Sequence, residues 1–186
     1  MKLAKKELAE LAKQIRACRL CRLSKSRKNA VPGEGPADAK LFFVGQAPGR
    51  KEDESGKPFV GMAGKFLDKL LAKVGIARGE VFITSAVKCF PPKNRKPRAD
   101  ELAACLPYLK AQLEAINPRL IILLGEIAVT ELLGKKLSEV AGKVTKKEGR
   151  NFFATFHPAA GMRFPKIRKR MEEDFRKIAL ISREDS

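Results

Sequence analysis

Residues 41–49 read Leu-Phe-Phe-Val-Gly-Gln-Ala-Pro-Gly, four apolar residues that run directly into a loop of Gly and Pro. A short apolar run that ends in glycine is typical of a strand buried on both faces. Similar runs occur at 81–87, 120–124 and 152–156. The sequence therefore predicts four buried strands, each followed by a segment that cannot continue the strand.

Helical apolar spacing fills the intervals between these strands. The expected helices cover residues 4–16, 63–74, 100–116, 126–133 and 166–181. We expect residues 46–61 to form a loop and residues 135–150 to be basic and irregular. Strands that alternate with helices favour a parallel sheet covered on both faces. The predicted fold is an α/β, three-layer α/β/α sandwich around a central four-stranded parallel sheet.

The composition indicates one globular domain, residues 1–186, that binds a polyanion. Lys and Arg number 39 against 21 acidic residues, which gives a net charge of +18. Such an excess favours nucleic acid as the partner, although acidic lipid or a merely solubilising surface would also fit. Residues 1–10 are charged and lack the apolar core of a signal peptide, and no apolar run reaches the roughly 20 residues of a membrane helix. We expect a cytoplasmic monomer that does not contact membranes.

Four cysteines form the first candidate site. Cys18 and Cys21 have C-x2-C spacing, and 15 residues separate Cys89 from Cys105. Disulfides are disfavoured inside a cell. Four thiolates could instead hold zinc or an iron–sulfur cluster, and the spacing does not distinguish them.

Three segments should meet at one edge of the sheet, because ligands bind beyond the carboxyl ends of parallel strands. They are Gly45–Asp53 after the first strand, Lys88-Cys89 after the second, and His157-Pro158 after the fourth. The glycines of the first segment allow a ligand to approach the backbone closely. His157 is the single histidine of the chain, and either a structural or a catalytic role is compatible with its position.

An ordered set of motifs runs through the chain. It comprises the C-x2-C pair, Gly45-Gln46-Ala47-Pro48-Gly49-x-x-Glu52-Asp53, Gly56-Lys57-Pro58-Phe59-Val60-Gly61, Val87-Lys88-Cys89-Phe90-Pro91-Pro92, Cys105 and His157-Pro158-Ala159-Ala160. This set, over about residues 10–180, resembles family 4 uracil-DNA glycosylases. The resemblance implies uracil-containing DNA as substrate and a largely structural [4Fe-4S] cluster on Cys18, Cys21, Cys89 and Cys105.

The expected chemistry is hydrolysis of a C–N bond, with the base leaving as an anion after it is flipped out of the DNA. His157 is suited to donate a hydrogen bond to uracil O2, and the backbone amides near Gln46 and Ala47 are further candidate donors. The family resemblance implies that Phe59 stacks on the flipped base, and Gly45 is a further candidate for binding the substrate. It also implies that Glu52 helps to exclude the methyl group of thymine.

Three positions qualify this assignment. Ala47 stands where better-known uracil glycosylases carry a water-activating Asp, as is usual for family 4. Gln46 replaces the usual Glu, and Ser85 replaces the Asn that reads the polar edge of uracil. A hydroxyl cannot reproduce the paired donor and acceptor of an amide, so hypoxanthine or xanthine is an alternative substrate base.

Residues after His157 are predicted to contact DNA. Met162, Arg163 or Phe164 could form a wedge that fills the gap left by the flipped base, or this segment could be a plain entry to the next helix. Arg168 and Lys169 would then lie near phosphates, together with Lys166 and Arg170. Two other classes also fit the sequence, namely a non-catalytic DNA-binding module with the same fold and a zinc-bound nucleic-acid adaptor.

Overall fold

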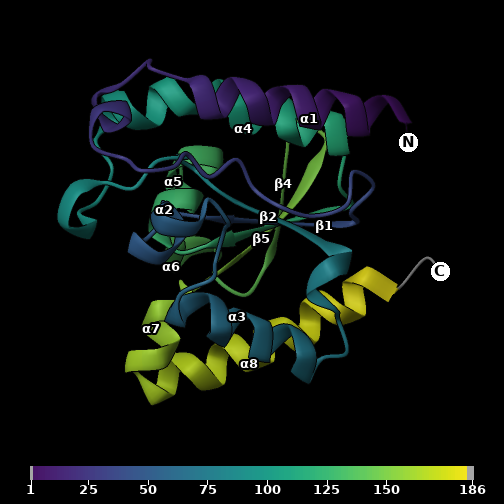
Figure 1. Cartoon of the computed structure of the whole chain (residues 1–186). Coiled ribbons are helices and arrows are strands. Elements are labelled where there is room, and N and C mark those ends of the chain that lie inside the picture. Colours follow the sequence, from purple (N-terminus) through teal and green to yellow (C-terminus); the bar gives the residue numbers. More distant parts are fainter. Residues whose placement is uncertain (1, 184–186) are drawn as a thin grey trace.

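The fold is built on a five-stranded sheet that lies between two layers of helices (Figure 1). The computed structural model describes residues 2–183. The strands are β1 (Leu41–Gly45), β2 (Val81–Ser85), β3 (Leu120–Leu124), β4 (Val144–Lys147) and β5 (Arg150–Thr155). Their order is β2-β1-β3-β5-β4, in which β4 alone runs antiparallel. The α/β sandwich predicted from the sequence is therefore correct in its layers.

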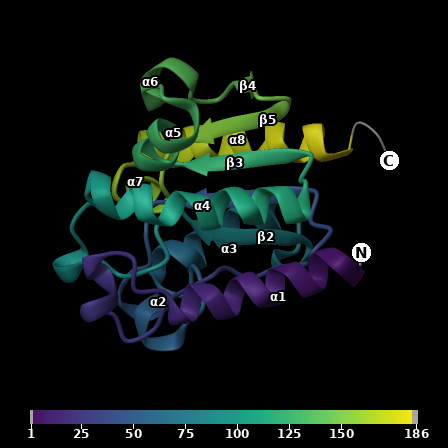
Figure 2. The ribbon, with the colours of Figure 1, turned by 90° about the horizontal axis from the view of Figure 1, so that it is seen from above.

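Alternate side chains of the central strands enter two separate cores. Phe42 and Val44 pack on one face of β1, whereas Leu41 and Phe43 pack on the other. The first face is covered by α4 (Ala99–Ile116), α5 (Glu126–Leu133) and α6 (Leu137–Val140). The second face is covered by α3 (Met62–Lys73) and α8 (Pro165–Arg183). Helix α1 (Lys2–Ala17) lies beside α4 in the first layer (Figure 2).

The prediction of four strands was wrong by one. Residues 144–147 pair with β5 as an antiparallel edge strand inside the segment that was expected to be irregular. The hairpin turns at Glu148 and Gly149, both with positive φ, as a two-residue turn between antiparallel strands requires. Strand β4 is hard to recognise because it lies at an edge and has no buried residue: Val144 and Lys146 are exposed, and Thr145 and Lys147 are partly covered.

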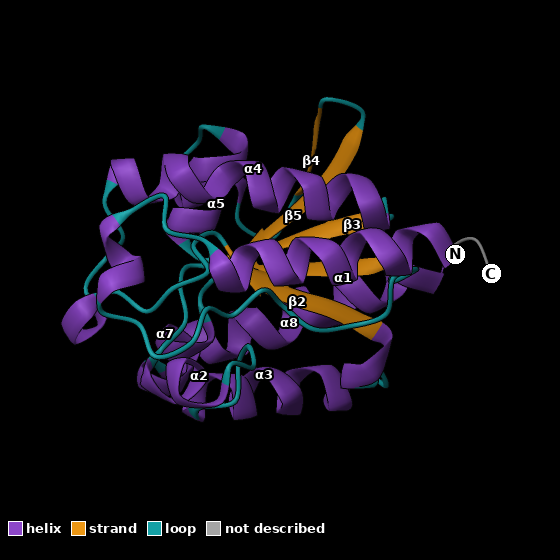
Figure 3. Ribbon diagram, turned by 45° about the horizontal axis from the view of Figure 1, so that its top comes forward, coloured by secondary structure: helices purple, strands orange, loops and turns teal. Residues whose placement is uncertain are grey.

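Besides α6, which lies within the segment 135–150 that was expected to be irregular, two short helices occupy segments that were expected to be loops. Helix α2 (Arg50–Ser55) lies within the predicted loop 46–61, and α7 (Pro158–Arg163) precedes α8 (Figure 3). Both are only six residues long, too short for a clear helical period in the sequence. Strand β2 ends at Ser85, two residues before the predicted end, and β5 begins at Arg150 and ends at Thr155.

Short 3-10 turns complete the chain at Arg22–Lys25, Arg78–Glu80 and Pro92–Asn94. Across residues 2–183 there is no helix of the length and apolar character needed to cross a membrane.

Candidate active site

A cavity of about 140 Å³ brings together most of the predicted active-site residues. Its lining includes Ala47, Glu52, Phe59, Ser85 and His157. These residues follow or end β1, β2 and β5, so the convergence at the carboxyl edge of the sheet is confirmed for these side chains. The cavity is small compared with a typical pocket for a drug-sized ligand, and its size suits a single planar base.

Phe59 forms one wall of this cavity, and two glycines make room for it. A Cβ atom on Gly45 would lie 2.6 Å from Phe59 Cζ, and one on Gly64 would lie 1.8 Å from the Phe59 carbonyl oxygen. Phe59 itself has a φ of 50°, a left-handed backbone conformation that costs a non-glycine residue energy. The aromatic ring is thus held in a fixed place at the cavity. Gly64 was not identified from the sequence.

His157 lies close to Phe59 in the lining of the cavity, with ring centroids 6.1 Å apart. Its Nδ1 atom accepts a hydrogen bond from the backbone N–H of Ala159 at 3.2 Å, because His157 caps the first turn of α7. Burial lowers the pKa of His157 to about 4, although the carboxylate of Glu52 acts in the opposite direction. A neutral imidazole that accepts at Nδ1 carries its proton on Nε2. The ring can therefore donate one hydrogen bond at neutral pH without being charged.

Glu52 holds the loop around the cavity through three backbone donors. Its Oε1 atom accepts from the N–H groups of Val60 and Gly61, both at 2.8 Å, and its Oε2 atom accepts from Gly49 at 3.0 Å. The carboxylate fastens the start of α2 to the segment that follows Phe59. Glu52 therefore lines the cavity, as predicted, and also fixes the position of the aromatic wall.

Ser85 is the last residue of β2, and Gln46 directly follows β1, so both lie at the carboxyl ends of two neighbouring parallel strands. Ser85 pairs with Gly45 in the sheet, and its buried side chain lines the cavity. The carbonyl of Gln46 accepts from the Val87 N–H at 3.3 Å. Gln46 is outside the cavity lining. The substitution of Ser for the usual Asn therefore changes a group that contacts this space.

Sequence analysis missed three residues of the cavity, namely Val31, Ala63 and Asn94. Val31 reaches it from the segment before β1, which is held by a hydrogen bond from the Val31 N–H to the Lys88 carbonyl at 2.7 Å. Asn94 lies at the mouth, is exposed, and has a φ of 56°. Nothing in the local sequence marks Asn94 as a site residue, and only the fold brings it to the cavity.

The second candidate site is a cavity lined by all four cysteines. Cys89 and Cys105 are buried, whereas Cys18 and Cys21 are partly exposed. The sequence-based grouping of distant cysteines is therefore supported by their position. Within residues 2–183 no three His, Cys, Asp or Glu side chains are grouped closely enough to hold a single metal ion.

Arg27 ties the cysteine segment together and was not identified from the sequence. Its guanidinium donates to Cys89 Sγ at 2.9 Å, to the Cys18 carbonyl at 2.7 Å and to the Arg16 carbonyl at 2.9 Å. Burial raises the pKa of the Cys89 thiol to about 11, and the hydrogen bond from Arg27 partly opposes this shift. A cation next to a sulfur favours the thiolate form that binds metals.

Lys88 departs from its predicted place. It was grouped with the segments at the ligand edge, but its side chain is fully buried away from the cavity. Its Nζ atom donates to Thr84 Oγ1 at 2.7 Å, to the Ser85 carbonyl at 2.9 Å and to Gln112 Oε1 at 2.8 Å. Burial lowers its pKa to about 7. Lys88 thus links the end of β2 to α4 rather than contacting a ligand.

The predicted DNA contacts after His157 differ in their surroundings: Arg168 contacts α7, whereas Met162, Arg163 and Lys169 are at least partly exposed. Arg168 donates to the carbonyls of Gly161 and Met162 at 3.2 and 3.3 Å and lies over the ring of Phe66, so it fastens α7 to α8. Arg163 is exposed at the end of α7, Met162 is partly exposed, and Lys169 is exposed on α8. Of these residues, Arg168 has the clearest structural role, and the others remain predicted DNA contacts.

Comparison with known proteins agrees with this arrangement. Residues 32–179 match the uracil DNA glycosylase superfamily. A type-4 uracil-DNA glycosylase of Saccharolobus solfataricus is 48% identical over 166 residues, which cover 83% of this chain and 76% of that protein. One of Pyrobaculum aerophilum is 48% identical over 162 residues, covering 81% and 82%. A type-5 uracil-DNA glycosylase of the same organism is 35% identical over 148 residues, covering 69% and 65%.

The fold, the cavity at its carboxyl edge and these matches define the class of protein: the chain belongs to the uracil-DNA glycosylase superfamily. Its higher identity to the type-4 proteins places it in the type-4 family, the family 4 indicated by its motifs.

Proposed function

We propose that this protein removes uracil from DNA by hydrolysing the bond between the base and its deoxyribose, which leaves an abasic site. The observation that carries this proposal is the closeness of His157, whose pKa is lowered by burial to about 4, to Phe59 in the lining of one small cavity. One side chain can donate to an oxygen of the base while the other stacks on its face. The identity to type-4 uracil-DNA glycosylases supports the same reaction.

His157 would stabilise the leaving group. As the C–N bond breaks, negative charge collects on uracil O2, and a donor aimed at that oxygen binds the transition state more tightly than the ground state. The N–H of Ala159 fixes the tautomer that places the donated proton on Nε2. A neutral donor also avoids the cost of burying an unpaired imidazolium ion in a mostly enclosed site.

Ala47 offers no acid or base, so water activation would contribute less than leaving-group stabilisation. The backbone amides near Gln46 and Ala47 are proposed as additional donors to the base. Glu52 would act mainly by holding Phe59 in place, because its carboxylate already accepts three backbone N–H groups.

The flipped base would leave a gap in the DNA stack that an apolar side chain can fill. Phe164 is nearly half exposed at the end of α7, whereas Met162 is more covered. We therefore favour Phe164 as the wedge, with Met162 and Arg163 beside it. Lys169 would contact phosphate, whereas Arg168 would keep α7 in position.

The cysteine cavity would hold a [4Fe-4S] cluster through Cys18, Cys21, Cys89 and Cys105. The cluster would serve as a structural cross-link between the N-terminal segment and α4. Arg27 donates to the sulfur of Cys89, and the backbone N–H of Lys88 donates to the sulfur of Cys105. Iron and sulfide analysis of the purified protein tests this. Cys105→Ala should lose iron, whereas Ser26→Ala, at an exposed position outside the lining of the cysteine cavity, should retain it. Stoichiometric zinc without iron would refute the cluster.

We also propose that the chain acts as a single domain and a monomer inside the cell, close to the nucleoid, where its DNA substrate lies. Size-exclusion chromatography with light scattering tests the oligomeric state directly.

The proposed activity is tested by incubating the protein with oligonucleotides that carry one uracil, hypoxanthine or xanthine, followed by alkaline cleavage at abasic sites. Strand cleavage at uracil is expected. Because Ser85 replaces an amide at the cavity, the other two bases measure how far specificity has shifted. A protein that binds these DNAs but releases none of the bases would be a binding module.

A further inference from the structure

We propose that a basic groove between α8 and the turn at residues 141–143 binds the phosphodiester backbone of DNA outside the base cavity. This inference rests on the proposed function, because it adds a second contact to the same DNA molecule. We call this surface the basic groove and define it by Lys143, Lys166, Lys169, Arg170 and Lys177.

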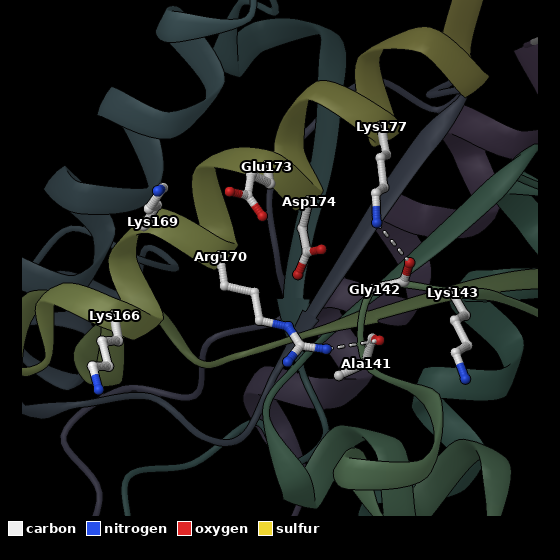
Figure 4. A pocket seen from close by; sticks show the side chains of 9 residues that line it. All are labelled: Ala141, Gly142, Lys143, Lys166, Lys169, Arg170, Glu173, Asp174 and Lys177. Carbon is white, nitrogen blue, oxygen red and sulfur yellow. Dashed lines mark hydrogen bonds between the residues drawn. The ribbon is translucent and has the colours of Figure 1, made fainter.

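The basic groove is a hollow of about 550 Å³ in which cations outnumber carboxyl groups (Figure 4). Five Lys and Arg side chains line it, together with Glu173 and Asp174. The Asp174 side chain is buried and accepts a hydrogen bond from Thr155 Oγ1 at 2.6 Å. The solvent-facing charge of the groove is therefore strongly positive.

Two of the cations are held in place. The Arg170 guanidinium donates to the Ala141 carbonyl at 3.5 Å, and the Lys177 ammonium donates to the Gly142 carbonyl at 3.3 Å (Figure 4). Arg170 also lies 5.7 Å from the centre of the Phe156 ring. Because the guanidinium has five N–H donors, these contacts leave donors free for an anion.

The other three cations lack partners in the part of the chain that the structure describes. The side chains of Lys143, Lys166 and Lys169 are exposed, and their ammonium groups form no hydrogen bond or ion pair with described residues. Lys143 comes from a turn more than 20 residues away in sequence from the lysines of α8. Such a group of unpaired charges repels itself, and a polyanion relieves that repulsion.

The floor of the groove is firmly anchored to the sheet. The Gly142 N–H donates to the Ala154 carbonyl at 2.8 Å, and Ala141 forms an isolated bridge with Ala154. Gly142 has a φ of 74°, and a Cβ atom there would lie 3.0 Å from Asp174 Oδ1. The turn can therefore approach α8 closely only with glycine at this position.

The groove and the base cavity flank the same junction in the chain. Phe156, which packs under Arg170, immediately precedes His157. Lys166 and Lys169 lie in the first turns of α8, directly after α7. A DNA strand that places its flipped base at His157 would pass from α7 toward the groove, where regularly spaced phosphates could meet the lysines.

The test compares two double variants that remove the same number of charges. Lys143→Gln with Lys169→Gln alters the groove. Lys40→Gln with Lys110→Gln alters two exposed lysines elsewhere, one before β1 and one on α4. Binding to a duplex with a central uracil is measured across a salt series. Each lost phosphate contact should reduce the slope of log K against log salt by about 1, so the groove variant should lose about 2 and the control much less.

Equal slopes for the two double variants would overturn the proposal, since the groove would then contribute only general charge. Weaker binding by the groove variant with an unchanged slope would also overturn it, because the loss would not involve phosphate. Uracil release by the unmodified protein is measured on the same duplex. If that release is absent, the proposed function fails independently of the groove.

Discussion

The base cavity and the basic groove lie on either side of the β5–α7 junction, yet they differ in almost every physical property. The cavity has about 140 Å³, a buried aromatic wall and one neutral imidazole, and its only carboxylate is saturated by backbone N–H groups. The groove has about 550 Å³ and is lined by five cations, three of them without partners among the described residues.

This difference suggests that the cavity acts in the chemical step, whereas the groove acts in DNA binding. The cavity offers short, fixed contacts of the kind that act on one transition state. The groove offers long-range charge that acts on any phosphate backbone and weakens as salt rises. Changes in the cavity should therefore appear in the rate of base release, and changes in the groove should appear in DNA binding.

The strongest test of this division is His157→Ala. Loss of the donor to uracil O2 should slow single-turnover release of uracil by about 100-fold or more, while DNA affinity stays nearly the same. Rapid-quench kinetics and a binding titration on one duplex measure both quantities. Full activity in this variant would remove the central catalytic assignment and favour a DNA-binding module.

Phe59→Leu should have the next largest effect. Stacking of a base on an aromatic ring is worth about 1–3 kcal/mol, which corresponds to roughly 5- to 150-fold in base release. Leucine keeps an apolar side chain in the buried site, so a thermal melt separates lost stacking from lost folding. Gly45→Ala is the companion variant, because its methyl group would push against the Phe59 ring. Wild-type release in both variants would show that the ring does not contact the base.

Ser85→Asn tests base selection. An amide supplies a donor and an acceptor where serine has one hydroxyl on a shorter stem, and one added hydrogen bond is worth about 0.5–1.5 kcal/mol. Uracil release relative to hypoxanthine and xanthine should rise about 2- to 10-fold on that basis. Ser85→Ala serves as the control that removes the hydroxyl. An unchanged ratio in Ser85→Asn would indicate that this position does not read the base.

The smallest effect concerns pH. The pKa of His157 is about 4, below its ordinary value of 6.5, so the folded protein binds fewer protons than the unfolded chain between these values. His157 should therefore contribute no pH dependence to stability above 6.5 and should destabilise the fold as pH falls from 6.5 through 4. Because the chain has one histidine, its NMR titration is unambiguous. A midpoint near 6.5 in the folded protein would show that burial does not lower the pKa of His157.

Local sequence patterns were sufficient for the elements with the strongest periodicity. The apolar runs at β1 and β3 predicted buried strands, and the amphipathic spacing predicted α3, α4 and α8 to within a few residues. The motif set also indicated the right family, which the comparisons confirm. Edge strand β4 and helices α2, α6 and α7 were missed, because short or polar elements leave little trace of burial in the sequence.

The same limit applies within the candidate active site. The sequence by itself determined which residues are suited to chemistry, such as His157, Phe59 and the four cysteines, because their side chains carry the required donors, rings and thiols within ordered motifs. Only the tertiary structure decided that Lys88 turns into the interior, that Arg168 fastens α7, and that Lys143 joins α8 in one groove. Those outcomes depend on contacts between residues far apart in the chain, where packing and charge desolvation, rather than local pattern, set the free energy.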